Sequence, residues 1–101
     1  MRLRVSRSAQ SDLDDIFVYW AKRAGLDVAD RLIDAMEEQF ALLAERPLMG
    51  RKCEEIAAGV RCFPAGKYLI YYRKARGALE ILHVFHGARD QESALRKSAP
   101  D

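Results

Sequence analysis

The chain has 101 residues, of which half are hydrophobic and 32% are charged, with a formal net charge of +2. This length suits one domain with a single hydrophobic core and excludes a second domain. The charges are mixed in sign, so attraction to nucleic acid is weak, and no apolar run suits a signal peptide or a membrane span. We expect a cytoplasmic protein with one domain over residues 1–97 and a flexible tail over residues 98–101.

The first predicted elements are a short strand and an amphipathic helix. Residues 3–5 alternate with polar neighbours, which is typical of a half-exposed strand. The period then changes to that of a helix from about Arg7 to Ala24, and either Ser6 or Ser8 can cap its start. Apolar residues recur at helical spacing at Ala9, Leu13, Ile16, Phe17 and Trp20.

A second helix follows almost at once. Gly25 can adopt the left-handed conformation that ends a helix, and Asp27 is expected to cap the next one with its side chain. Pro47 prevents continuation of this second helix. Its apolar stripe consists of Ala29, Leu32, Ile33, Met36, Phe40 and Leu43. The two stripes predict a helical hairpin with one buried seam.

The second half of the chain favours a sheet. Residues 48–59 lack a period and are predicted to form a loop. Short connections over residues 64–67 and at Arg76–Gly77 predict a three-stranded antiparallel meander. Its strands are expected at residues 60–63, 68–73 and 79–86. Residues 89–97 are predicted to form a short C-terminal helix, which completes an α+β fold.

This sheet has apolar residues on both faces. Alternate residues of a strand covered on one face only should be polar, but residues 68–72 and 81–85 are apolar or aromatic on both sides. One helical hairpin can cover one face. We expect a second chain to cover the other, because a large exposed apolar patch marks a partner site. The alternatives are cover by the long loop and C-terminal helix, or self-association.

Neither the cysteines nor the acidic cluster predicts a metal site. Cys53 and Cys62 have no metal-type spacing and are expected to be thiols in a reducing compartment, one in a loop and one in the core. Asp12, Asp14 and Asp15 fan around a helix, whereas a hard cation needs convergent oxygens. We therefore predict no metal and no cofactor.

The order of these features resembles that of the ParE-type toxins of the ParE/RelE superfamily from Val5 to about Leu95. The residues that carry the resemblance are Ser8-Ala9, Asp12-Leu13, Ile16, Tyr19-Trp20, Phe40, Leu43, Pro47, Gly50, Gly59-Val60-Arg61, Phe63, Gly66, Tyr68, Ile70, Tyr72-Arg73 and the stretch from Val84 to Asp90. The resemblance implies an N-terminal strand, a helical hairpin and a three-stranded meander. This is the same fold that the periodicity predicts.

The resemblance also implies partners and an activity. It implies a ParD-like antitoxin whose C-terminal region wraps the toxin, and operator DNA reached only indirectly, through that antitoxin. Toxins of the ParE type are understood to inhibit DNA gyrase by trapping its cleaved-DNA state. Relatives of the RelE type cut messenger RNA on the ribosome, so a ribosome-dependent endonuclease is the alternative. A member that has lost its toxicity is a third interpretation.

The chemistry of the chain favours a gyrase-inhibiting binding protein over an enzyme. Cutting RNA needs a general base, a general acid and cations at the phosphate. Residues 91–96 contain no tyrosine where the RelE-type nucleases have one, and the lysine pair of their loop is not clearly matched. His83 and His86 are three apart and should point to opposite faces. Together with Arg89 they are the catalytic residues of the alternative.

We predict that partner contacts concentrate on the meander and the segment after it. Arginine suits phosphate and carboxylate recognition because it donates two parallel hydrogen bonds. Arg61 fits equally well as a paired structural residue. The predicted partner-binding residues are Arg61, Tyr71, Arg73, Phe85, Arg89 and Asp90.

Overall fold

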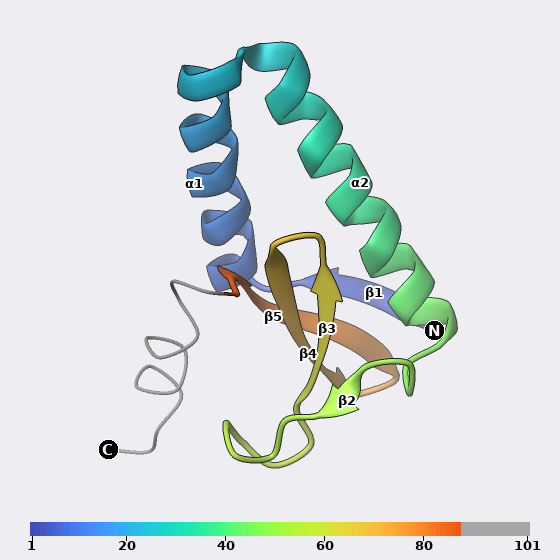
Figure 1. Cartoon of the computed structure of the whole chain (residues 1–101). Coiled ribbons are helices and arrows are strands. Elements are labelled where there is room, and N and C mark those ends of the chain that lie inside the picture. Colours follow the sequence, from blue (N-terminus) through green and yellow to red (C-terminus); the bar gives the residue numbers. More distant parts are fainter. Residues whose placement is uncertain (88–101) are drawn as a thin grey trace.

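The computed structural model describes residues 1–87 and shows a helical hairpin on one face of a mixed sheet (Figure 1). The elements are β1 (Arg2–Val5), α1 (Arg7–Ala24), α2 (Leu26–Glu45), β2 (Arg51–Lys52), β3 (Arg61–Ala65), β4 (Tyr68–Ala75) and β5 (Ala78–His86). Within the described residues the strand order is β1-β5-β4-β3-β2. Only the β1–β5 pair is parallel. The predicted α+β fold is confirmed, and the predicted C-terminal helix and tail lie outside these residues.

The junction between β1 and α1 forms as the sequence predicts. Ser6 caps α1, since its hydroxyl accepts a hydrogen bond from the backbone N–H of Ala9 at 3.0 Å. The same hydroxyl donates to the carbonyl of Leu82, and the backbone N–H of Ser6 donates to the carbonyl of Ile81. The helix therefore starts against β5 at the point where the pairing of β1 ends.

The turn between the helices is tighter than predicted. Gly25 has a φ of 95°, which favours glycine, and its carbonyl accepts the first hydrogen bond of α2 from Ala29. Helix α2 begins at Leu26 and has no side-chain cap. The prediction that Asp27 caps this helix is wrong, because Asp27 already lies in the first helical turn. At this position the negative carboxylate of Asp27 interacts favourably with the positive N-terminal end of the helix dipole.

The meander matches the prediction, with changes at its borders. Strand β3 extends through Pro64 and Ala65, so the connection to β4 shrinks to Gly66 and Lys67. The predicted loop contains an additional edge strand, β2, which pairs with the first two residues of β3. Pro64 lies beyond the β2–β3 pairing, so its lack of a backbone N–H removes no hydrogen bond to β2.

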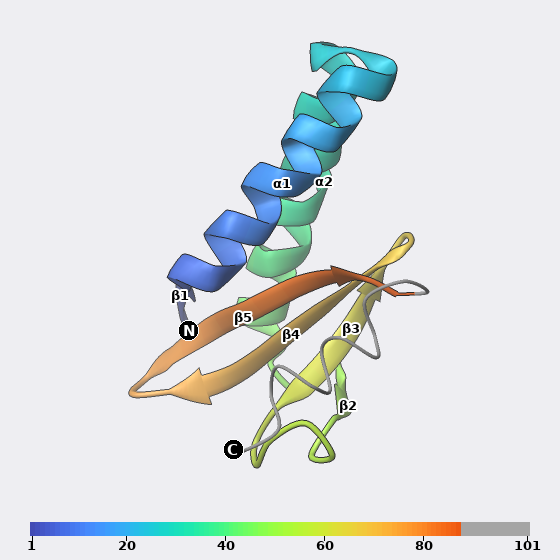
Figure 2. The ribbon, with the colours of Figure 1, turned by 90° about the vertical axis from the view of Figure 1, so that its left-hand side faces the viewer.

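The hairpin stands on one side of the sheet (Figure 2). The main core joins buried residues of both helices to buried residues of the strands, as the two apolar stripes predict. Trp20 and Tyr68 join the two layers at its border through a 2.8 Å hydrogen bond from the indole N–H to the phenol oxygen. None of the described helices is long and apolar enough to cross a membrane. The buried residues of the main core are Ala9, Leu13, Ile16, Met36, Phe40, Leu43, Ala44, Tyr68, Ile70, Tyr72, Leu79, Ile81 and Val84.

Candidate partner-binding face

The sheet carries a second hydrophobic cluster on the face away from the hairpin, which we call the outer face. Its buried members are Cys53, Val60, Cys62, Tyr71 and Phe85, and Ile56, Leu69 and Leu82 pack at its border, partly buried. Three of these residues, Cys53, Ile56 and Val60, come from the segment between β2 and β3. The long loop therefore covers part of the outer face, which was one of the alternatives that the sequence left open.

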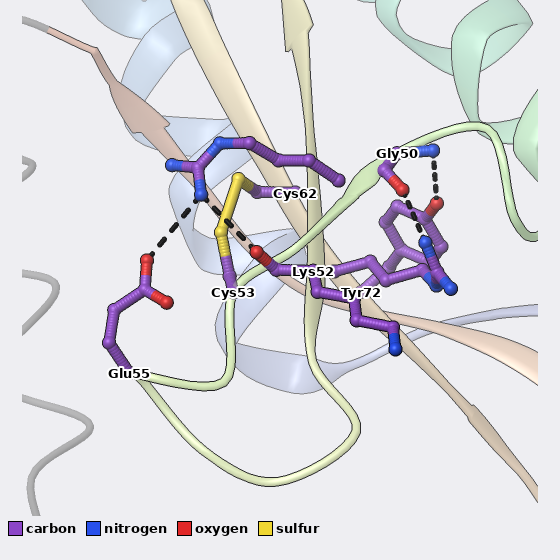
Figure 3. The surroundings of a disulfide bond; sticks show 8 residues. Gly50, Lys52, Cys53, Glu55, Cys62 and Tyr72 are labelled. Carbon is purple, nitrogen blue, oxygen red and sulfur yellow. Dashed lines mark hydrogen bonds and ion pairs between the residues drawn. A yellow bond between two sulfur atoms is a disulfide. The ribbon is translucent and has the colours of Figure 1, made fainter.

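A disulfide bond between Cys53 and Cys62 anchors this loop to β3 (Figure 3). The two Cα atoms are 6.0 Å apart, a usual separation for a disulfide. The backbone N–H of Cys53 donates to the carbonyl of Val60, which continues the β2–β3 pairing and brings the cysteines together. The prediction that both cysteines are thiols is wrong, because cross-strand pairing of nearby residues leaves no signal in cysteine spacing.

Charged residues border the loop where it leaves the sheet. Arg51 forms an ion pair with Glu55 at 3.5 Å, and both side chains are exposed, so the pair contributes little stability. Burial raises the pKa of the Tyr71 phenol beneath them, while Arg51 opposes this shift and Glu55 adds to it. Tyr71 is therefore a neutral phenol at neutral pH.

A groove of about 300 Å³ crosses the outer face between the loop and the start of α1. Apolar side chains form much of its surface, and Arg73 and two serine hydroxyls add polar groups. Its lining residues are Ser6, Ser8, Ile56, Ala57, Val60, Tyr71, Arg73, Leu82 and His83. Such a groove can bind apolar side chains of a partner and can fix their orientation with a few polar contacts.

The two histidines point to opposite faces, as the alternation predicts. A β-bulge leaves Leu82 without a partner on β4, and both Leu82 and His83 line the groove. The His83 ring stacks on Phe85 with centroids 4.6 Å apart, whereas His86 contacts the Tyr68 ring on the hairpin side. The histidines therefore do not converge on one substrate position.

Asp12 reaches the sheet from α1 and completes the hydrogen bonding of β5. Its Oδ2 accepts from the backbone N–H of Val84 at 3.0 Å and lies 3.1 Å from Nδ1 of His83. The described part of the chain contains no group of three or more His, Cys, Asp or Glu residues able to hold a metal ion. The role of Asp12 in the described structure is to bond the exposed edge of β5 beyond the end of β1.

Arg61 lies on the hairpin side of the sheet, beside Tyr72 in the β3–β4 register. Its Nη1 donates to the carbonyl of Gly50 at 2.6 Å. The Tyr72 Oη accepts a hydrogen bond from the Gly50 N–H (Figure 3) and donates one to the carbonyl of Pro47. A Cβ on Gly50 would lie 2.5 Å from Tyr72 Oη, so only glycine fits. Burial raises the pKa of Tyr72, opposed by the Gly50 hydrogen bond and Arg61. Arg61 thus has a structural partner.

Three of the predicted partner residues come together on the outer face. Tyr71 and Phe85 form part of the buried cluster, with 3% and 5% of their surface exposed. Arg73 pairs with Glu80 at 3.2 Å and has 48% of its side chain exposed at the groove. Arg89 and Asp90 lie outside the described residues. The sequence analysis did not predict Ile56 or Val60 as partner residues. The signal at Ile56 is its apolar character within a charged loop, and Val60 was assigned only to the start of a strand.

Known proteins similar to this chain point to one family. The model of the family described as ParE toxin of type II toxin-antitoxin system, parDE, matches residues 3–91. Toxin ParE1 of Caulobacter vibrioides is 33% identical over 92 residues, which cover 91% of this chain and 95% of that protein. Toxin ParE1 of Mycobacterium tuberculosis is 30% identical over 95 residues, which cover 93% and 97% of the two chains.

A solved structure shares the fold. It is described as the chromosomal ParDE TA system from P. aeruginosa, and its chain superposes with a TM-score of 0.76 at 24% sequence identity. The superposition covers 85% of this chain and 95% of the other. The hairpin-on-sheet arrangement is therefore not particular to this sequence.

Proposed function

Because the chain belongs to the ParE toxin family and is the toxin of a ParDE type II toxin-antitoxin system, we propose that its outer face binds the antitoxin and that the free toxin inhibits DNA gyrase. A ParDE system implies a cognate antitoxin of the ParD type. The observation that carries the first proposal is the groove on the outer face. It combines apolar lining with a half-exposed arginine.

The groove indicates which kind of antitoxin segment would fit. Apolar side chains of the antitoxin would pack on Ile56 and Leu82, which are only partly buried in the free toxin. A carboxylate of the antitoxin would reach the exposed side of Arg73. Tyr71 and Phe85 support this surface from below, and we retain Arg89 and Asp90 as further contacts.

A charge introduced into the groove tests the antitoxin site. Leu82→Glu should weaken antitoxin binding more than about 30-fold, because a carboxylate would replace an apolar contact at the centre of the interface. Leu48→Glu is the matched control, since Leu48 is 63% exposed and lies outside the groove. Calorimetric titration of folded variants with the purified antitoxin measures the effect. Equal affinities of the two variants would exclude this face as the site.

The gyrase proposal rests on family membership and on the placement of the histidines. His83 lies against Asp12 and Phe85, while His86 lies on the other face, so the two do not form the acid and base that RNA cleavage needs. No metal or cofactor takes part in the proposal. We place the toxin in the cytoplasm with its target, and operator DNA is reached through the antitoxin.

Two assays on antitoxin-free protein test the target. We expect lost supercoiling of plasmid DNA by gyrase, or accumulation of cleaved DNA, while messenger RNA on translating ribosomes stays intact. Cut messenger RNA with unaffected gyrase would overturn the proposal in favour of the endonuclease, with His83, His86 and Arg89 as the residues to test. No effect in either assay, and no growth arrest in cells, would indicate a member without toxicity.

A further inference from the structure

The low net charge of the chain conceals a strong separation of charge between its two layers. Residues 7–45, which form the hairpin, contain nine acids and four bases, a net charge of −5. Residues 1–6 and 46–87, which form the sheet and its loops, contain ten bases and three acids, a net charge of +7. The weak attraction to nucleic acid expected from the total of +2 therefore does not apply to the sheet layer.

Three arginines gather at one end of this basic layer, and we call Arg2, Arg4 and Arg76 the arginine cluster. Arg2 and Arg4 are alternate residues of the edge strand β1, so they share one face of it. Arg76 lies in the turn between β4 and β5, two residues before Ala78, which pairs with Arg2. The three arginines line a surface hollow of about 400 Å³ together with Leu3 and Ala78.

The charges of the arginine cluster are not compensated within the described residues. None of its three side chains forms an ion pair or hydrogen bond with residues 1–87. The acid nearest in the register, Glu80, lies opposite Arg4 but is paired with Arg73. Three exposed cations around one hollow repel one another, which an anionic ligand would relieve.

The backbone at Arg76 adds an independent observation. Arg76 and Gly77 both have positive φ, 51° and 76°, which is the pattern of a type I′ hairpin turn. This turn favours asparagine or glycine at both positions, and Arg76 is the only non-glycine residue with positive φ among the described residues. An arginine in this place strains the turn, and its side chain forms no hydrogen bond or ion pair with residues 1–87, so its guanidinium group is available for a ligand.

We propose that the arginine cluster binds the phosphate backbone of duplex DNA. Guanidinium groups bind phosphate through two parallel hydrogen bonds. Side chains of Arg2 and Arg4 start roughly 7 Å apart along the strand, a separation that suits neighbouring phosphates of one DNA strand. The hollow has no aromatic lining on which unpaired bases could stack, which favours duplex over single-stranded nucleic acid. It also has little apolar surface for a peptide, unlike the groove.

This inference goes beyond the proposed function, because it requires neither gyrase nor an antitoxin. The contact reads no base and is sequence-independent. It is a second surface of the toxin, formed by β1 and the β4–β5 turn, whereas the groove lies between the loop and α1. The sequence predicted contact with operator DNA only through the antitoxin, and the arginine cluster would add a direct one.

The test measures salt-dependent binding of the full chain to a fluorescent duplex of arbitrary sequence by anisotropy. Three phosphate contacts give a slope of about −2.7 in log K against log salt, or about 40-fold weaker binding between 50 and 200 mM KCl. The variant R2Q/R4Q/R76N should lose this part of the slope. The control K22Q/R23Q/R31Q removes three charges from the hairpin and should retain it.

Arg76→Asn alone separates ligand binding from folding. Asparagine suits the positive φ of a type I′ turn, so the melting temperature should stay equal or rise while the slope falls by about 0.9. An unchanged slope in this variant would overturn the proposal. Equal losses of slope in the R2Q/R4Q/R76N and K22Q/R23Q/R31Q variants would also overturn it, because they would show that binding depends on the total charge of the protein and not on the arginine cluster. Tighter binding of single-stranded RNA, or of polyglutamate, than of the duplex would assign the arginine cluster to another partner and also overturn it.

Discussion

The two faces of the sheet are covered in different ways. On the hairpin side, two long regular helices pack on the strands, and the main core contains thirteen buried residues among those described. On the outer face, an irregular loop held by a disulfide covers a cluster of five. The same strands supply both clusters, since β4 alternates between them.

This difference assigns folding stability mainly to the hairpin side of the sheet and partner recognition to the outer face. A helix layer can relax only as a unit, whereas a loop can move without breaking the sheet. The hairpin side therefore provides most of the folding free energy, and the outer face keeps partly buried apolar residues that a partner can cover.

One substitution applied to both faces tests the comparison directly. Phe40→Ala should lower the free energy of unfolding by about 3–5 kcal/mol, because rigid helices cannot fill the cavity. Phe85→Ala removes the same atoms beneath the loop and should cost about 2 kcal/mol less, since the loop can relax into the space. Urea unfolding of both variants gives the two values. Equal losses would show that the loop packs as rigidly as the helices.

Removing the disulfide should destabilise the whole fold and should loosen the outer face most. Reduction frees a ten-residue loop in the unfolded chain and should lower the free energy of unfolding by about 2–3 kcal/mol. Hydrogen exchange should quicken at the amides of residues 51–60, while those of the main core keep their order of protection. Cys53→Ala/Cys62→Ala is the control, because reductant should not change it further. A wild-type urea midpoint unaffected by reductant would contradict the prediction.

Regular structure on the hairpin side was predictable from sequence because it has a period. The spacing from Ala9 to Trp20 and the glycine at position 25 predicted both helices to within a few residues. Three strands and their turns followed from apolar runs and from Gly66 and Gly77. The cap at Asp27 failed for a local reason: the Gly25 carbonyl starts the second helix before Asp27 can act.

The outer face was less predictable because its cover depends on contacts between segments without a period. Strand β2 has two residues, too few for alternation to show. Cys53 and Cys62 meet only because the loop pairs with β3. The sequence did indicate that something covers this face, through the apolar residues at Tyr71 and Phe85. It left open whether the cover was the chain itself or a partner.

The network at Tyr72 links the two faces, because it holds the start of the loop to the sheet. Tyr72→Phe leaves the buried N–H of Gly50 without its acceptor and should lower the free energy of unfolding by about 2 kcal/mol. Urea unfolding measures this change. Tyr68→Phe is the control, since within residues 1–87 that phenol bonds only to the indole of Trp20, at the border of the core. Equal losses of stability in the two variants would contradict a special role for the Tyr72–Gly50 hydrogen bond.

The same phenol gives the fold a defined sensitivity to base. Burial raises the pKa of Tyr72 above the unfolded value of 10.0, so the folded state favours the neutral phenol. The stability from this effect is fully present below pH 10 and is lost as the pH rises through the folded pKa. The wild type should therefore lose more stability above pH 10 than Tyr72→Phe does. Parallel losses would assign the effect to Tyr71, whose pKa is also raised.

The smallest expected effect lies where the two layers meet, at Asp12. Asp12→Ala removes the acceptor for the N–H of Val84 and the neighbour of His83, and it should cost about 1 kcal/mol because water can reach the partly buried site. Asp12→Asn keeps an acceptor oxygen and should recover most of this loss. Asp15→Ala, on the same helix without a bond to the sheet, is the control for helix charge. Faster amide exchange at Val84 in Asp12→Ala alone would place the effect at β5. Equal effects of Asp12→Ala and Asp15→Ala would show that the Asp12–Val84 hydrogen bond does not hold α1 to the edge of the groove.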